Sequence, residues 1–281
     1  MRVLITGAAG LLGLQVSKEY KARGFEVYSL TKKDLDISNH TSIKIALIDT
    51  RPHLVINCAA FTDVDRAETE KEQAFITNGL APRLLATACR RCKSTLVQIS
   101  TDHIFNGKSK RSYLVSDTPD PINVYGASKL MGEQGVREAG CNYYIIRTSW
   151  LFGPGGKNFA HTILKLAREN DTIKVVNDQH GCPTYTPDLA RGIADLAQTG
   201  IYGTYHYTNT GATTKYKFAK RILEAVALTT KADPCSTSQF PRPARRPAYS
   251  ALSLFPIQQV LGYTPPTWEE AVDNYIKPPL P

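Results

Sequence analysis

Residues 3–13 of the chain read VLITGAAGLLG. The apolar residues 3–6 are typical of a strand buried on both faces, and the amphipathic stretch 12–23 predicts a helix after the glycines. Glycines in such a turn let a pyrophosphate approach the backbone, and the start of the helix offers free N–H groups to its phosphates. The spacing is G-x-x-G-x-x-G, whereas the commoner fingerprint is G-x-G-x-x-G. Because the turn lies between a strand and a helix, we predict a dinucleotide-binding loop made of Gly7, Gly10, Leu11, Leu12 and Gly13.

The same alternation of short apolar runs and amphipathic stretches continues through the first half of the chain. Further strands are expected at 26–30, 54–58, 95–100 and 143–148, with helices at 41–49, 72–91 and 124–139. Such alternation is typical of βαβ units on a parallel sheet. We therefore predict an α/β fold of the Rossmann type, in which helices cover both faces of a doubly wound parallel sheet.

The second half of the chain has fewer apolar strands and more Gly and Pro. Helices are expected at 160–169, from about 188, at 217–227 and at 268–276, with strands at 172–176 and near 205–208. We predict a dinucleotide-binding domain over 1–149 and a mainly substrate-binding part over 150–281. The two parts are expected to be interleaved, because the segments about 172–177 and 204–208 are predicted to return to the sheet.

The composition argues against a nucleic-acid-binding, membrane-spanning or zinc-binding protein. The chain has 281 residues and a net charge of +9, but its basic residues are scattered and no basic helix with interleaved aromatics occurs. No apolar run approaches the roughly 20 residues needed to cross a bilayer. Of the six cysteines, only Cys89 and Cys92 form a C-x-x-C, and no second pair gives zinc spacing. We expect a cytoplasmic protein with reduced thiols, no metal site, and no nucleic-acid or membrane partner.

The end of the second strand indicates which dinucleotide is bound. A carboxylate there would hydrogen-bond the ribose of NAD, whereas a cation accommodates the 2′-phosphate of NADP. This chain has Lys32 and Lys33 at that point and no acid. We predict NADPH as the cofactor, with NADH as the alternative, and we place Asp36 and Ile37 near the adenine.

Tyr125 and Lys129 lie four residues apart and should share one face of a helix. A carbonyl that receives a hydride also needs a proton, and a nearby ammonium would lower the pKa of a tyrosine that donates it. Thr101 follows a buried strand, at the end where ligands bind in open α/β sheets. It could hydrogen-bond the reacting oxygen. Together the three residues predict a hydride-transfer centre for a carbonyl substrate.

These motifs, in this order, resemble the extended short-chain dehydrogenase/reductase superfamily and, within it, the dTDP-4-dehydrorhamnose reductase family. The resemblance extends from Val3 to about Ala271. Its carriers are the stretches 34–37, 55–62, 64–68, 100–107, 123–129, 147–150, 158–159, 178–184 and 244–247.

The resemblance implies reduction of the C4 keto group of dTDP-4-dehydro-L-rhamnose, with Tyr125 as the proton donor. It implies catalytic roles for Thr101, Tyr125 and Lys129. It also implies cofactor contacts along a path made of Ala59, Ala60, Thr62, Asn78 and Ser100, together with Tyr125 and Lys129 themselves. The nucleotide sugar is expected to meet Thr101, Asp102, Phe105, Trp150, Asn158, Gln179, Thr184 and Arg246.

Simpler roles remain open for several of these residues. Trp150 follows a buried strand and could be a core aromatic, while Asn158 could cap a helix. Gln179 and Thr184 flank a proline and could be ordinary turn residues. Asp102 could orient its loop without touching the substrate. For the cation that pairs with a diphosphate, Arg245 is the alternative to Arg246.

Two features depart from the pattern of the family. His103 stands where a tyrosine is usual, and the stretch 111–117 lacks the usual glutamate. Some relatives bind magnesium at a dimer interface through acidic residues that have no evident counterpart here. Magnesium is therefore left open, and the chain is expected to be a monomer or a homodimer.

Two other functions remain open. A 4-ketoreductase acting on another nucleotide deoxysugar would share the same chemistry. A non-catalytic, dinucleotide-binding subunit that resembles the methionine adenosyltransferase β subunit would keep the first half of the chain. That subunit would tend to lose Trp150 and the stretch 178–184, both of which are present.

Overall fold

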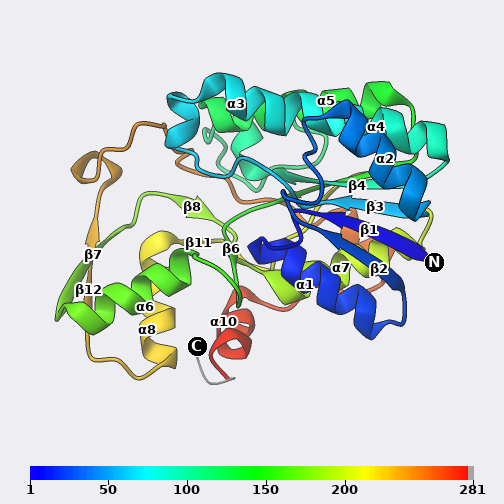
Figure 1. Ribbon diagram of the computed structural model, residues 1–281. Coiled ribbons are helices and arrows are strands. Elements are labelled where there is room, and N and C mark those ends of the chain that lie inside the picture. Colours follow the sequence, from blue (N-terminus) through cyan, green and yellow to red (C-terminus); the bar gives the residue numbers. More distant parts are fainter. Residues whose placement is uncertain (278–281) are drawn as a thin grey trace.

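The computed structural model describes residues 1–277. Its centre is a six-stranded, wholly parallel sheet with the order β10-β5-β4-β3-β1-β2 (Figure 1). The strands are β1 (Arg2–Thr6), β2 (Glu26–Leu30), β3 (Leu54–Asn57), β4 (Thr95–Thr101), β5 (Tyr143–Thr148) and β10 (Gly203–His206). The predicted Rossmann-type parallel sheet is confirmed. Each of the first five strands lies within one residue of its predicted bounds.

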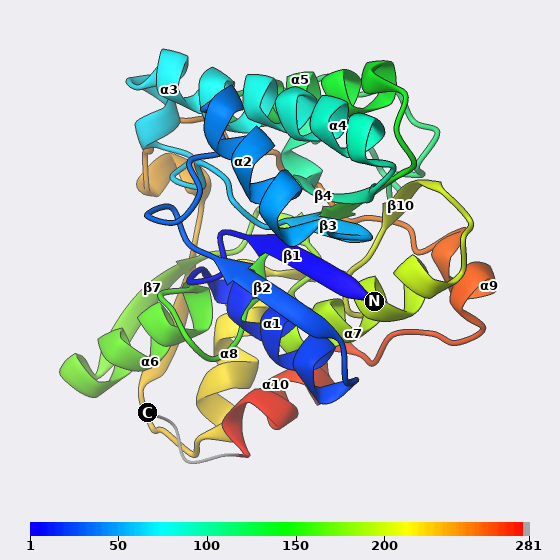
Figure 2. The ribbon, with the colours of Figure 1, turned by 45° about the vertical axis from the view of Figure 1, so that its right-hand side comes forward.

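Helices cover both faces of this sheet. On one face lie α1 (Leu11–Ala22) and α7 (Thr186–Gln198), and on the other lie α2 (His40–Thr50), α4 (Ala81–Cys92) and α5 (Val124–Ala139) (Figures 1 and 2). The sheet residues are buried on both sides, as Leu4 and Ile5 show with no exposed surface. Each face thus has its own hydrophobic core, which explains the near-continuous apolar strands.

The helix predicted over 72–91 is present and runs without a gap from Lys71 to Cys92, but it contains a π-helical turn that the sequence does not predict. The structure has α3 (Lys71–Phe75), a π-helical turn η2 (Ile76–Leu80) and then α4. Pro82 has no N–H to donate to the carbonyl of Asn78, so the helical hydrogen bonds are interrupted at this point. The Asn78 carbonyl instead lies against Gly132 of α5, where an added Cβ would be 2.1 Å away. The irregular turn therefore lets the two helices pack closely.

A second, smaller core lies beside the sheet. It is formed by α6 (Phe159–Glu169), α8 (Lys215–Ala225) and α10 (Trp268–Ile276), together with the parallel pair β7 (Thr172–Val176) and β12 (Lys231–Cys235). Two shorter pairs join β6 (Leu151–Phe152) to β9 (Thr184–Tyr185) and β8 (His180–Gly181) to β11 (Thr213–Thr214). The prediction that 172–177 returns to the main sheet is wrong, because β7 pairs with β12.

The two halves of the chain are nevertheless interleaved. The predicted return near 204–208 corresponds to β10, which pairs with β5, and α7 packs against α1. A short helix, α9 (Ile257–Leu261), also packs on α7 (Figure 2). The last four residues of the predicted second domain, 278–281, lie outside the described residues. Within 1–277, no helix is long and apolar enough to cross a membrane.

Candidate active site

A cavity of about 810 Å³ lies at the carboxyl ends of β1 to β5. All the residues that follow these strand ends meet there because the strands are parallel. The residues predicted from the sequence that line it are Gly7, Gly10, Leu11, Leu12, Lys32, Asp36, Ile37, Ala59, Ala60, Thr62, Ser100, Thr101, Asp102, Tyr125, Lys129 and Trp150. The volume and the elongated lining, from the loop after β2 to the loop after β5, suit a dinucleotide with a small substrate.

The glycine turn after β1 fits a pyrophosphate. Gly7 has a φ of 62°, and a Cβ there would lie 2.6 Å from the backbone N of Ala59. Gly10 is the N-cap of α1 and supplies no side chain to cap the helix, and the first turn of α1 holds no acidic residue. The free N–H groups and the positive end of the helix dipole therefore face the cavity. Gly13 packs against the Gly7 backbone behind this turn.

The loop after β2 forms the other end of the cavity. Lys32 lines it, as do Asp36 and Ile37, whereas Lys33 is not among its lining residues within 1–277. Asp36 Oδ1 accepts hydrogen bonds from Ser38 N at 2.9 Å and from Ser38 Oγ at 2.6 Å. These hydrogen bonds lower the pKa of Asp36. Lys32 is thus the cation available to a phosphate at this end.

The predicted catalytic residues converge from two elements. Thr101 is the last residue of β4, and Tyr125 and Lys129 lie on the first turns of α5. The helix begins at Asn123, whose side chain accepts from Gly126 N at 2.8 Å. A Cβ on Gly126 would lie 2.1 Å from the His103 carbonyl oxygen, so glycine is needed for α5 to approach the loop after β4. This close approach brings Tyr125 beside Thr101 and His103.

Burial dominates the electrostatics of this centre. It raises the pKa of Tyr125 to about 12, while a side-chain contact from Thr101 opposes the shift and the charge of Asp102 adds to it. Burial also lowers the pKa of Lys129 to about 8, against the charge of Glu133. The charge of Lys129 is not among the causes of the Tyr125 pKa shift, so its expected lowering of that pKa stays a prediction. The ammonium of Lys129 instead donates to the carbonyl oxygen of Ile99 at 2.5 Å.

Asn78 holds the loop after β3 and is absent from the cavity lining within 1–277. Its Oδ1 accepts from Phe61 N at 2.8 Å and its Nδ2 donates to Phe61 O at 2.9 Å. The same amide donates to the Ser128 hydroxyl of α5 at 3.1 Å. Asn78 therefore positions Ala60 and its neighbours against the catalytic helix, whereas direct contact with the cofactor had been expected.

Trp150 and Asp102, both predicted to meet the substrate, line the cavity. Trp150 has a φ of 46°, a left-handed conformation that costs energy in a residue with a bulky side chain. Its indole lies against Gly181, where an added Cβ would be 2.6 Å from the ring. Asp102 is buried and accepts from Ser250 Oγ at 2.6 Å and from Thr101 Oγ1 at 3.1 Å. Asp102 thus orients the loop and also faces the cavity.

Five predicted substrate residues, Arg246 among them, are absent from the cavity lining within 1–277. Phe105 has no exposed surface and stacks on Tyr113 with ring centroids 4.2 Å apart, so it is a core residue. Thr184 is equally buried in β9. Asn158 is the N-cap of α6 and accepts from His161 N at 3.1 Å. Gln179 donates to the Thr237 hydroxyl at 3.1 Å.

Arg246 is the better placed of the two neighbouring arginines. It forms an ion pair with Asp65 at 3.0 Å and donates to the Ala244 carbonyl. Its charge reaches the site, because it adds to the lowering of the His103 pKa that burial causes. Arg245 contributes its backbone carbonyl, which accepts from the side chain of Asn123 at 2.8 Å.

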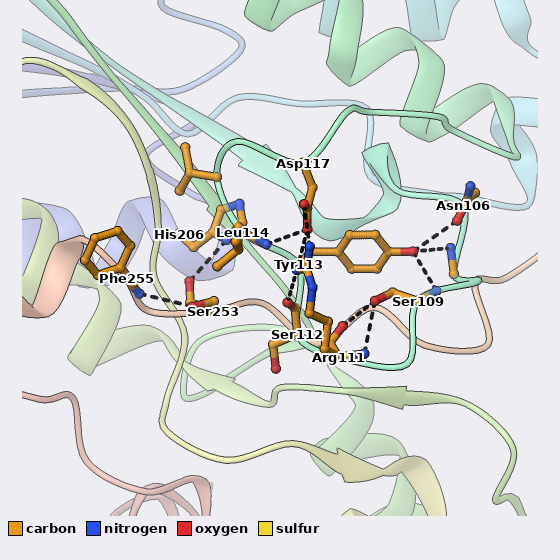
Figure 3. Close-up of polar contacts among 12 residues, drawn as sticks. Asn106, Ser109, Arg111, Ser112, Tyr113, Leu114, Asp117, His206, Ser253 and Phe255 are labelled. Atoms are coloured by element: carbon orange, nitrogen blue, oxygen red, sulfur yellow. Dashed lines mark hydrogen bonds and ion pairs between the residues drawn. The ribbon is translucent and has the colours of Figure 1, made fainter.

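The stretch 111–117 forms a loop that is anchored to the core through Tyr113, which is buried and pairs with the backbone around Leu252. Arg111 makes a bidentate ion pair with Asp117 at 2.8 Å, and Asp117 also accepts from the backbone N of Leu114 (Figure 3). The Tyr113 hydroxyl binds Asn106 and two backbone N–H groups on the other side of the loop. No residue of this stretch lines the cavity in the described part of the chain. The usual glutamate thus has no replacement at the cavity.

Several cavity residues were missed from the sequence. Arg66, Gln73 and Lys157 line it, and their polar side chains carry no local motif that distinguishes them from surface residues. His103, noted only as a departure, lines it too, and its ring meets that of Tyr125 edge-on with centroids 5.4 Å apart. Across residues 1–277, no group of three or more His, Cys, Asp or Glu side chains is arranged to hold a metal ion.

Known proteins resemble the chain over nearly its whole length. The family model described as RmlD substrate binding domain matches residues 1–279. The dTDP-4-dehydrorhamnose reductase of Streptomyces griseus is 42% identical over 258 residues, which are 89% of this chain and 85% of that protein. The spore coat polysaccharide biosynthesis protein SpsK of Bacillus subtilis (strain 168) is 40% identical over 276 residues, 98% of this chain and 97% of that protein.

One solved structure also resembles the chain over nearly its whole length. The crystal structure of dTDP-4-dehydrorhamnose reductase from Bacillus anthracis str. Ames, in complex with NADP, superposes with a TM-score of 0.95. Its sequence is 41% identical, and the match covers 98% of each chain. The resemblance predicted from the sequence is confirmed, and the chain belongs to the RmlD substrate binding domain family.

Proposed function

We propose that the chain reduces the C4 keto group of dTDP-4-dehydro-L-rhamnose to give dTDP-L-rhamnose, with NADPH as the reductant. The observation that carries this proposal is the convergence of Thr101, Tyr125 and Lys129 at one end of a dinucleotide-sized cavity. The names of the relatives support the substrate, and the NADP complex of the Bacillus anthracis protein supports the cofactor.

The dinucleotide would supply the hydride, and the residues of the chain would do the rest. The C4 carbon accepts the hydride, the electron pair of the carbonyl moves to oxygen, and that oxygen takes the proton of the Tyr125 hydroxyl. Thr101 would hydrogen-bond the same oxygen. Lys129 would bind the nicotinamide ribose and hold positive charge near the phenolate that remains.

The remaining cofactor and substrate roles follow the lining of the cavity. Gly7, Gly10, Leu11 and Leu12 would bind the pyrophosphate through the backbone. Lys32 would bind the 2′-phosphate. Trp150 would flank the sugar, with Arg246 on the side of the diphosphate. We also propose a cytoplasmic location, which the six free cysteines support. The assembly state, monomer or homodimer, stays a prediction.

Replacing Lys32 with alanine should weaken NADPH binding about tenfold and leave NADH binding unchanged, because only NADPH carries the 2′-phosphate. Lys33→Ala is the matched control, since Lys33 is the exposed neighbour that does not line the cavity within 1–277. Fluorescence titration of each dinucleotide measures both affinities. An equal loss for the two dinucleotides would contradict the proposed role of Lys32.

The function itself is tested by loss of absorbance at 340 nm with NADPH and dTDP-4-dehydro-L-rhamnose. We expect substrate-dependent oxidation of NADPH and formation of dTDP-L-rhamnose. Turnover of a different dTDP-4-keto-6-deoxysugar, with none of this one, would assign the chain to a related 4-ketoreductase. Binding of NADPH with no turnover of either sugar would favour the non-catalytic subunit.

A further inference from the structure

Lys215 is a half-buried cation that the proposed mechanism does not use. It is the first residue of α8, and its Nζ lies 3.5 Å from the ring centroid of Trp150 and 4.7 Å from that of Phe159. An ammonium at this distance over an indole makes a cation–π interaction. Lys215 is not among the residues that line the cavity within 1–277, but Trp150, which lies under its ammonium, is one of them.

The surroundings of Lys215 do not neutralise its charge. Among residues 1–277, no carboxylate lies within 4.0 Å of its Nζ and no side-chain hydrogen bond satisfies it. Burial lowers the pKa of Lys215 to about 7, opposed by the charge of Asp102 and reinforced by that of Arg246. Its place at the start of a helix is also unfavourable for a cation, since the helix dipole is positive there. An anion bound to Lys215 would supply the missing counter-charge, offset the cost of burial and oppose the positive end of the helix dipole.

Lys215 belongs to one cluster with the catalytic loop. Burial lowers the pKa of His103, and the charges of Arg246 and Lys215 both add to that shift. His103 in turn touches Tyr125 edge-on. The charges of Lys215 and Arg246 therefore both act on the imidazole that contacts the Tyr125 ring. In a nucleotide sugar, the diphosphate on C1 is separated from C4 by the width of one sugar ring.

We propose that Lys215 binds the diphosphate of the nucleotide sugar, on the side of the site where Arg246 also lies. This inference rests on the proposed function. The three N–H donors of Lys215 allow it to bond phosphate oxygens while the ammonium stays over Trp150. The indole would then be held between the lysine stem and Gly181, which fixes the wall against which the sugar packs.

The test compares ligands that differ only in phosphate. Holoenzyme saturated with NADP is titrated calorimetrically with dTDP and with thymidine, for the native chain, Lys215→Met and Lys217→Met. Lys217 is an exposed lysine on the same helix and is the matched control. We expect Lys215→Met to weaken dTDP binding about ten- to hundredfold, with thymidine binding unchanged. Lys217→Met should match the native chain for both ligands.

Turnover gives a second readout. Lys215→Met should raise KM for the keto sugar by a similar factor with kcat nearly unchanged, because the interaction is the same in the ground and transition states. Lys215→Arg should restore most of the dTDP affinity. Equal weakening of dTDP and thymidine in Lys215→Met would overturn the proposal, since Lys215 would then only support Trp150. Unchanged dTDP binding would overturn it as well.

The pH dependence of dTDP binding distinguishes a role of the Lys215 charge from a role of its side chain in packing. The groups facing Lys215 are Asp102 and His103 from the loop after β4 and Arg246, with Trp150 and Phe159 uncharged. As pH rises from about 6 to about 9, Lys215 loses its proton, so native dTDP affinity should fall. Lys215→Arg stays charged and should show a much smaller fall.

The proposed function and this inference can fail separately. If native enzyme reduces the keto sugar but Lys215→Met binds dTDP normally, only the inference fails. If native enzyme does not reduce this sugar, yet binds dTDP in a Lys215-dependent way, only the assigned sugar is wrong. A native chain that binds no dTDP would overturn both.

Discussion

Replacing Tyr125 with phenylalanine will lower kcat for reduction of the keto sugar by about two to four orders of magnitude, the scale of a lost general acid. The phenol lines the cavity beside Thr101 and is half-buried. Since burial raises its pKa to about 12, it stays protonated at neutral pH and is available as a donor. Removal of one hydroxyl should leave NADPH affinity within about twofold.

The measurement is initial-rate kinetics with NADPH, together with NADPH titration of the same preparations. Tyr202→Phe is the control, because Tyr202 is 46% exposed on the loop before β10. It should retain native kcat. If Tyr125→Phe keeps more than about a tenth of native kcat, another group donates the proton. His103, with its ring centroid 5.4 Å from that of Tyr125, would then be the first residue to replace.

Much of this site follows from patterns that act over short stretches of chain. The glycine turn after β1 and the i,i+4 pair of Tyr125 and Lys129 depend on local geometry, so the sequence places them correctly. The parallel sheet then brings the strand ends together, which is why residues after five different strands line one cavity. Long apolar strands also allowed the strand bounds to be predicted within about one residue.

The errors concern contacts between distant segments. β7 has the alternation of a strand, but only the tertiary fold decides that it pairs with β12. The π-helical turn within the helix over 72–91 lies where the Asn78 carbonyl packs against Gly132, some fifty residues further on. Phe105 was assigned to the substrate by resemblance, yet it is covered by Tyr113.

Lys215 illustrates what a sequence pattern cannot reveal without the fold. It stands in an amphipathic helix with three other basic residues, Lys217, Lys220 and Arg221, so it resembles any solvated lysine. The available signal was its place directly after the N-cap Thr214, where a cation is unfavourable. That position indicates a functional role for Lys215 only once the fold places Trp150, from another element, under its ammonium.

Glu133→Gln should lower the free energy of unfolding by about 3–5 kcal/mol, because it leaves a buried cation without its counter-charge. Glu133 has no exposed surface and accepts from Arg147 Nε at 3.0 Å, Arg147 Nη2 at 2.9 Å and Arg137 Nη2 at 2.7 Å. The Ser100 hydroxyl donates to it at 2.6 Å. This network joins α5 to β4 and β5 directly behind the catalytic residues, so the loss should also disturb the cavity.

Urea unfolding at neutral pH measures the effect, with Glu138→Gln as the control on the same helix. Glu138 pairs with Arg83 at 3.8 Å and its side chain is 63% exposed, so its loss should cost less than about 1 kcal/mol. Equal stabilities for the two variants would show that the buried pair contributes nothing net.

Burial alone would raise the pKa of Glu133, but Arg147 and Ser100 outweigh it and hold the pKa below its usual value. The stabilisation is therefore complete above the ordinary carboxyl pKa of about 4.3 and is lost as the pH falls through the lower folded-state value. The difference between the native chain and Glu133→Gln should accordingly shrink in acid.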